Sequence, residues 1–152
     1  MENRDRTKMT DNSFQKVGNS EQRLYGPRKI LLCGYSQEDR LRFHDMLRDS
    51  GLSDIELLVA DDTTLNQTVR ALFEQPISRA PQKGPAMPRA AIMGGITEKE
   101  LHTVLNAYRQ TGLPGQFWAT LTPVSENWRL GDLLSELQKE NEALRKRQPA
   151  KN

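Results

Sequence analysis

Two glycine-containing segments hold the residues of this chain whose types and spacing best suit ligand binding. Each follows a short apolar run and precedes a hydroxyl residue that can begin a helix, so backbone N–H groups and a helix dipole can converge on one point. The candidate ligand-binding residues are Gly34, Tyr35, Ser36, Gly94, Gly95 and Thr97. Such N–H groups favour anions, so an anionic metabolite or a nucleotide is the ligand class to consider.

The same two helix starts also argue against an anion. Ser36 and Thr97 are each followed three residues later by an acid, Asp39 and Glu100, which is the capping-box arrangement. The caps occupy the free N–H groups, and the carboxylates place negative charge where an anion would bind. Neither G-x-G-x-x-G nor a Gly-Lys-Ser/Thr phosphate loop follows the apolar runs. A small-molecule site is therefore the alternative hypothesis for this chain.

Catalysis and metal binding have no residues to support them. His44 and His102 lack an accompanying Cys or Asp pattern, and we expect both on helix surfaces. Cys33 lies inside an apolar run and is expected to be a small buried residue, although its position leaves a reactive thiol open. Asp61–Asp62 is expected to cap a helix that begins near Thr63. We predict a non-enzymatic protein with no catalytic residue, no metal site and no cofactor.

A pattern that occurs twice, at a constant offset of 61 residues, predicts the elements that position these residues. Residues 28–36 lie over 89–97, and residues 48–52 lie over 109–113. Each copy is predicted to run strand, helix, strand, helix. The predicted strands are 30–33, 55–59, 90–93 and 117–121, and the predicted helices begin near Ser36, Thr64, Thr97 and Asn127.

The character of the strands predicts their places in a sheet. The first and third are continuous apolar runs, typical of strands covered on both faces, whereas the second and fourth mix polar and apolar residues like edge strands. We predict an α/β fold in which two βαβα repeats form one small open parallel four-stranded sheet, in the order 2-1-3-4, with helices on both faces. In that arrangement the carboxyl ends of strands one and three meet, and the six candidate residues form one crevice.

The composition along the chain predicts a single folded domain. Residues 1–27 contain little apolar material, and four prolines lie between 76 and 88. The predicted organisation is a disordered N-terminal tail (1–27), one α/β domain (28–147, with repeat one 28–75, a proline-rich tether 76–88 and repeat two 89–147) and a disordered C-terminal tail (148–152).

The last predicted helix holds the candidate interaction residues. Trp128 is interpreted as a lid over the sheet, with an exposed contact as the alternative. Leu130, Leu137 and Leu144 recur every seven residues, so the helix is either a solvated extension or a short coiled-coil seam that forms a dimer. The candidate interaction residues are Trp128, Leu137 and Leu144.

Charge and hydropathy limit the partners. The chain of 152 residues has 22 basic and 20 acidic residues, a net charge of +2, with the two signs interspersed, so nucleic-acid binding is not expected. No apolar run approaches the length needed to cross a bilayer, and we expect no membrane partner. The single cysteine is consistent with a reducing, cytoplasmic location.

The second copy resembles a known bacterial family. Its segment Met93-Gly-Gly-Ile-Thr97 and the stretch from Leu121 to Leu144, with Asn127-Trp-Arg-Leu130 at the start of an acidic helix, are similar to the domain of unknown function 3783. The resemblance covers about Arg89 to Leu144, with a degenerate copy at about Arg28 to Glu74. It supports the fold and implies no reaction. The leading hypothesis is therefore a non-catalytic binding or regulatory module, whose partner is an unknown protein or a second copy through the C-terminal helix.

Overall fold

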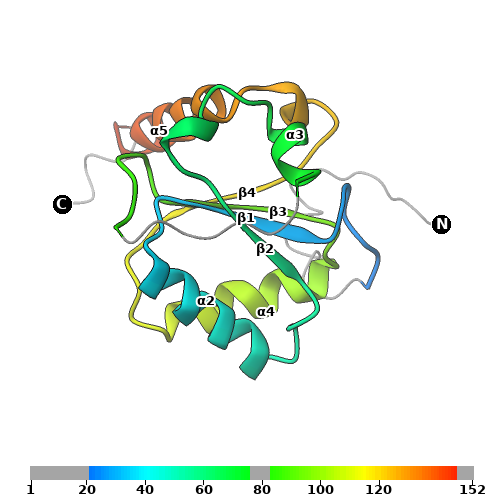
Figure 1. Cartoon of the computed structure of the whole chain (residues 1–152). Coiled ribbons are helices and arrows are strands. Elements are labelled where there is room, and N and C mark those ends of the chain that lie inside the picture. Colours follow the sequence, from blue (N-terminus) through cyan, green and yellow to red (C-terminus); the bar gives the residue numbers. More distant parts are fainter. Residues whose placement is uncertain (1–20, 76–82, 147–152) are drawn as a thin grey trace.

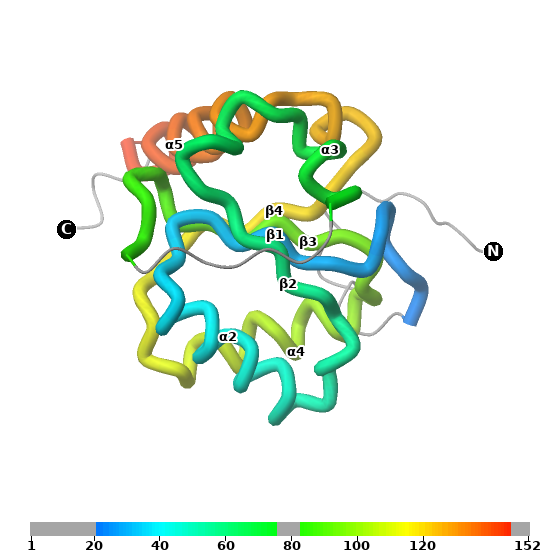
Figure 2. Tube along the Cα trace, in the orientation of Figure 1, coloured from blue at the N-terminus to red at the C-terminus, as the bar shows by residue number. Residues whose placement is uncertain are grey.

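A computed structural model describes residues 21–75 and 83–146 of the chain (Figures 1 and 2). The predicted C-terminal tail, residues 1–20 of the predicted N-terminal tail and residues 76–82 of the predicted tether lie outside the described residues.

The two halves of the chain have the same order of elements. Each runs strand, helix, strand, 3-10 turn, helix. The first half comprises β1 (Lys29–Cys33), α2 (Gln37–Asp49), β2 (Glu56–Val59), η2 (Asp62–Thr64) and α3 (Val69–Phe73), and the second comprises β3 (Ala90–Gly94), α4 (Glu98–Arg109), β4 (Phe117–Thr120), η3 (Ser125–Asn127) and α5 (Leu130–Lys146).

Helices α3 and α5 begin later than the sequence predicts, because each follows a separate 3-10 turn. An isolated antiparallel bridge between Thr68 and Arg129 fixes extended backbone immediately before both helices. The Thr68 hydroxyl then caps α3 by accepting a hydrogen bond from the Ala71 N–H. Asp61 caps the 3-10 turn η2, as predicted for the start of that helical segment.

The four strands form one sheet in the predicted order, β2-β1-β3-β4, with β2 and β4 at the edges. The prediction of a parallel sheet is wrong. β1 pairs with β2 and β3 with β4 in parallel, but β1 and β3 run antiparallel, and Leu31 lies opposite Ile92. Two βαβα halves related by a twofold axis normal to the sheet must have antiparallel central strands, because such an axis reverses strand direction. The sheet is therefore mixed.

Helices cover both faces of the sheet, as predicted. In Figure 1, α2 and α4 lie on one side of the strands and α3 and α5 on the other. Ile30 and Leu32 of β1 belong to the core beneath α2 and α4, whereas Leu31 and Cys33 belong to the core beneath α3 and α5. This alternation follows from the two-residue period of a strand, and it makes β1 and β3 the buried centre of the molecule.

Parts of the predicted tail and tether pack against the domain. The Leu24 N–H donates to the Ile96 carbonyl at 2.7 Å, and the Gly95 N–H donates to the Tyr25 carbonyl at 3.1 Å. Residues 23–25 of the predicted disordered tail are therefore ordered, because these hydrogen bonds and a bridge between Arg23 and Thr97 pair them with residues 95–97. Residues 83–88 of the tether pass close to Gly34, where an added Cβ would lie 3.1 Å from the Met87 carbonyl oxygen.

Two ion pairs cross between the halves. The Arg28 guanidinium, just before β1, donates to both carboxylate oxygens of Glu100 at 2.6 and 2.9 Å. Arg89, just before β3, donates to Asp39 at 3.0 Å. Because β1 and β3 are antiparallel, the start of each strand lies beside the helix that follows the other strand. Each arginine therefore neutralises the acid in the first turn of the opposite half's helix.

Within residues 21–75 and 83–146, no helix has the length and apolar character that crossing a membrane requires.

We predict that Gly95→Ala destabilises the protein by more than about 2 kcal/mol. Gly95 has φ +65, and an added Cβ would lie 2.6 Å from three backbone atoms of residues 26–28. Gly51→Ala is the matched control, because Gly51 has φ +77 but nothing within 4 Å of the added Cβ. That control incurs only left-handed strain, about 1–2 kcal/mol. Urea denaturation measures both, and equal losses would contradict the close-packing explanation.

We predict that Arg28→Gln lowers the free energy of unfolding by about 2 kcal/mol at pH 7. The Arg28 guanidinium lowers the pKa of Glu100, so this stabilisation is present above the ordinary glutamate pKa of about 4.3 and is lost as the pH falls through the lower folded-state pKa. The free energies of unfolding of the wild type and the variant should therefore converge in strong acid. Arg70→Gln, which breaks an exposed pair with Glu74, should cost less than about 0.5 kcal/mol. An Arg28→Gln deficit that stays constant from pH 7 to strong acid would refute the explanation.

Candidate functional site

The antiparallel pairing of β1 and β3 separates the six candidate ligand-binding residues into two groups. Cys33 lies opposite Ala90 and Lys29 lies opposite Gly94, so β1 and β3 end at opposite sides of the sheet. Gly34, Tyr35 and Ser36 follow one end, and Gly94, Gly95 and Thr97 lie at the other. The predicted crevice between them does not form, because its geometry required parallel strands.

Tyr35 is a core residue at the first of these ends. Its side chain is fully buried, and its hydroxyl donates to Gln116 Oε1 at 2.7 Å. The Arg89 guanidinium carbon lies 3.9 Å from the centre of the Tyr35 ring, a cation–π contact. Burial raises the pKa of the Tyr35 hydroxyl, which keeps it protonated. Tyr35 therefore holds the strand end together and is closed to a ligand.

Ser36, Asp39 and Arg89 form a chain of contacts at this end. The Ser36 hydroxyl accepts from the Asp39 N–H at 3.2 Å, and the Asp39 carboxylate binds Arg89. Only the forward half of the predicted capping box is therefore present here. In the described part of the chain, Arg89 Nη2 and Gln116 Nε2 are buried donors without a hydrogen-bond partner.

The second end is occupied in the same way. Thr97 and Glu100 form a complete capping box, with the Thr97 N–H donating to Glu100 Oε1 at 2.9 Å and the Glu100 N–H donating to the Thr97 hydroxyl at 3.0 Å. Glu100 also binds Arg28, and the Tyr25 carbonyl accepts a hydrogen bond from the Gly95 N–H. The backbone donors that would have held an anion already have protein partners.

Sequence reasoning missed Arg28 and Arg89, although a signal for them was visible. Both stand immediately before an apolar strand, at equivalent places in the two aligned segments. Their partners were identified, but only as helix caps. The offset of 61 positions aligns Arg28 with Arg89, and Asp39 with Glu100. Predicting that each arginine pairs with the acid of the other half would have required the direction of β3.

The cysteine is buried, and the two histidines lie on helix surfaces. Cys33 is fully buried, and burial raises the pKa of its thiol to about 12, so the reactive thiolate is scarce at neutral pH. His44 and His102 are exposed on α2 and α4. Among residues 21–75 and 83–146, no three His, Cys, Asp or Glu side chains lie together in a way that could hold a metal ion.

The leucines of α5 are divided between the core and solvent. Leu130, Leu133 and Leu134 are buried, and Leu137 is partly buried against the same core. Leu144 is 54% exposed. The seven-residue spacing therefore marks in part the face that covers the sheet, and it leaves Leu144 as the exposed member of the predicted seam.

The partial exposure of Trp128 favours the alternative of an exposed contact over a lid. Trp128 keeps 37% of its surface in solvent, in the short segment between η3 and α5. The backbone on both sides is fixed, since the Trp128 carbonyl accepts from the Val69 N–H and the Leu130 N–H donates to the Gln67 carbonyl, both at 2.9 Å. Rigid backbone thus presents a large aromatic side chain at the surface.

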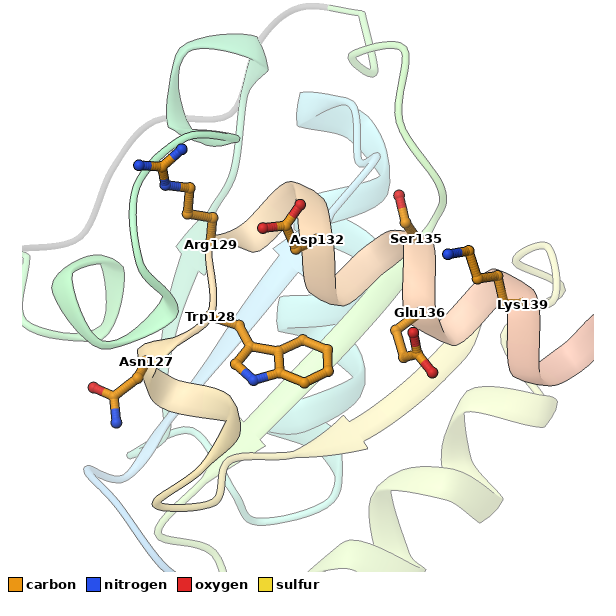
Figure 3. Close-up of a pocket in the computed structure, with 7 residues that line it drawn as sticks. All are labelled: Asn127, Trp128, Arg129, Asp132, Ser135, Glu136 and Lys139. Atoms are coloured by element: carbon orange, nitrogen blue, oxygen red, sulfur yellow. The ribbon is translucent and has the colours of Figure 1, made fainter.

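A shallow depression of about 540 Å³ adjoins Trp128 (Figure 3). The indole lies beside the start of α5, and polar side chains follow along the helix. The depression is lined by Asn127, Trp128, Arg129, Asp132, Ser135, Glu136 and Lys139. We call these residues the Trp128 surface. This surface combines one aromatic ring with charges of both signs.

Comparison with known proteins finds a match to one family model. Residues 89–144 match the model of the domain of unknown function DUF3783, and the matched segment runs from just before β3 into the last turns of α5. No curated protein and no solved structure matched the chain. The match confirms the resemblance predicted from the Met93–Thr97 segment and from the Asn127–Leu130 helix start.

Proposed function

We propose that this chain is a non-catalytic binding or regulatory module that docks a protein partner on the Trp128 surface. The observation that carries the proposal is the exposure of Trp128 on a backbone hydrogen-bonded to the first half of the chain. Tryptophan is enriched among the residues that dominate binding free energy in protein interfaces. A fixed backbone reduces the conformational entropy lost on binding, which strengthens such a contact.

The use made of the polar residues supports a non-catalytic role. At both strand ends the candidate groups bind each other: Arg89 with Asp39, Arg28 with Glu100, and Tyr35 with Gln116. In each pair, the charge or hydrogen-bonding capacity of the side chain is used by its partner, whereas a catalytic side chain must be free to act on a substrate. The Cys33 thiol is buried in the core, and burial raises its pKa, so it stays protonated.

The alternative hypothesis, a small-molecule site for an anionic metabolite or a nucleotide, loses its structural basis. It required Gly34 and Gly94–Gly95 to line one crevice, and they lie at opposite ends of an antiparallel pair. Each end alone offers a capped helix with a carboxylate in its first turn, Asp39 or Glu100. Negative charge at that position disfavours a bound anion.

We further propose that the two halves are copies of one βαβα unit. Three observations support this: Leu31 pairs with Ile92, Thr68 pairs with Arg129, and both separations equal the 61 residues that separate the two sequence patterns. A single twofold axis would pass through both pairs.

We also propose a cytoplasmic location, since a buried, unpaired Cys33 is compatible with a reducing compartment.

We predict that Cys33 reacts with a thiol reagent only when the protein unfolds. A fully buried thiol with a raised pKa offers neither access nor thiolate. Ellman's reagent should therefore modify the native protein far more slowly than the protein in concentrated urea. Native labelling as fast as labelling in urea would show that Cys33 is accessible and would revive a role for a reactive thiol.

We predict that a photo-reactive amino acid at position 128 crosslinks a specific protein in cells. Leu41, which is 48% exposed on α2 across the sheet, is the matched control position. A partner that docks on the Trp128 surface should be captured from position 128 and not from position 41. Trp128→Ala should then weaken binding of the purified partner by about tenfold or more. Identical adducts from both positions, or binding unchanged in Trp128→Ala, would refute the proposal.

A further inference from the structure

The strand β4 forms an edge of the sheet that the protein covers less than the other edge. All four β4 residues, Phe117–Thr120, are partly exposed, whereas three of the four β2 residues, Leu57–Val59, are buried. β4 is the last strand in the sheet order and pairs only with β3 within the described residues. Exposed edge strands readily pair with another chain.

The hydrogen bonding of β4 determines which backbone groups face outward. The Phe117 N–H donates to the Arg89 carbonyl, and the Leu121 N–H donates to the Met93 carbonyl. Backbone groups alternate in direction along a strand, so the N–H and C=O groups of Trp118 and Thr120 face the free edge. The N–H and C=O groups of these two residues could form four hydrogen bonds to an added antiparallel strand whose middle residue lies opposite Ala119.

An apolar groove of about 540 Å³ lies beside this edge, between β4 and α4. Most of its lining is hydrophobic or aromatic, and it is formed by Met93, Leu101, Leu105, Tyr108, Arg109, Trp118, Ala119 and Thr120. The groove adjoins the outward backbone groups, so a strand added at the edge would also cover apolar side chains. This surface is distinct from the Trp128 surface.

We propose that the occupant of the β4 edge is the β4 strand of a second copy of this chain, in antiparallel register about a twofold axis beside Ala119. Trp118 would then lie opposite Thr120 of the partner subunit, and the two four-stranded sheets would become one. Two strand spacings are about 10 Å, which is also the distance between packed helices. The two copies of α4, which lies beside β4, would therefore meet at ordinary helix-packing distance.

The charges on α4 complement themselves in this arrangement. Glu98, Leu105 and Arg109 lie on one stripe, since residues 7 and 11 apart share a helix face, and the last two line the groove. A twofold axis near Leu105 would place Glu98 beside Arg109 of the partner subunit. Neither Glu98 nor Arg109 has an ion-pair partner within residues 21–75 and 83–146.

The self-complementary charges of α4 favour a second copy of this chain over an unrelated peptide as the occupant of the β4 edge.

The experiment is sedimentation equilibrium of the full chain and of two edge variants. Thr120→Pro removes an N–H that faces away from β3, and it should raise the dimer dissociation constant by about tenfold or more. Thr120→Val keeps that N–H and should leave the dissociation constant within about threefold of the wild type. Circular dichroism establishes that each variant is folded.

A charge-reversal series decides the question independently of the proline. Glu98→Arg and Arg109→Glu should each weaken the dimer by about tenfold, and the double variant should restore it to within about threefold of the wild type. A wild-type chain that stays monomeric up to about 1 mM would overturn the inference. So would a dimer that withstands both single reversals, because its interface would lie elsewhere. Either outcome leaves crosslinking from position 128 unaffected, so the two proposals fail separately.

Discussion

The antiparallel pairing of β1 and β3 is the constraint on which the rest of the structure depends. It joins the two halves through five paired positions and buries the strands of both halves at the centre. Because it reverses one half relative to the other, the start of each central strand lies beside the first turn of the opposite half's helix. Arg28 and Arg89 can therefore bind Glu100 and Asp39. Partly buried charges are stable only when paired, so these two contacts and the strand direction support one another.

The order of the strands could be predicted from the sequence, but the direction of the second half could not. Continuous apolar runs identified the two central strands, and mixed runs identified the edges. A run such as Ile30–Cys33 presents the same side chains to a parallel or an antiparallel neighbour, and the long connection between α3 and β3 allows either direction. The assumption of a twofold axis normal to the sheet would have predicted the direction, because such an axis makes the two central strands antiparallel.

The predicted crevice does not form for the same reason, and the exposure of Trp128 differs from the prediction for another. Gly34 and Gly94 were placed together only by the assumed strand direction. Trp128 was interpreted as buried because large aromatic residues usually are, but residue type alone does not give exposure. The helical spacing of Leu130 and Leu137 was correctly recognised, yet spacing cannot distinguish a face that covers the protein's own sheet from a seam that meets another chain.

The two halves share an architecture but differ in what they expose, and the difference bears on function. At the place of Trp128 the first half has Gln67, which binds Gln75. The edge strand of the first half is mostly buried, whereas every residue of β4 is partly exposed. Helix α3 has 5 residues and α5 has 17. The first half therefore supplies mainly core and support, while the second half carries both candidate docking surfaces. The second half is also the segment that matches DUF3783.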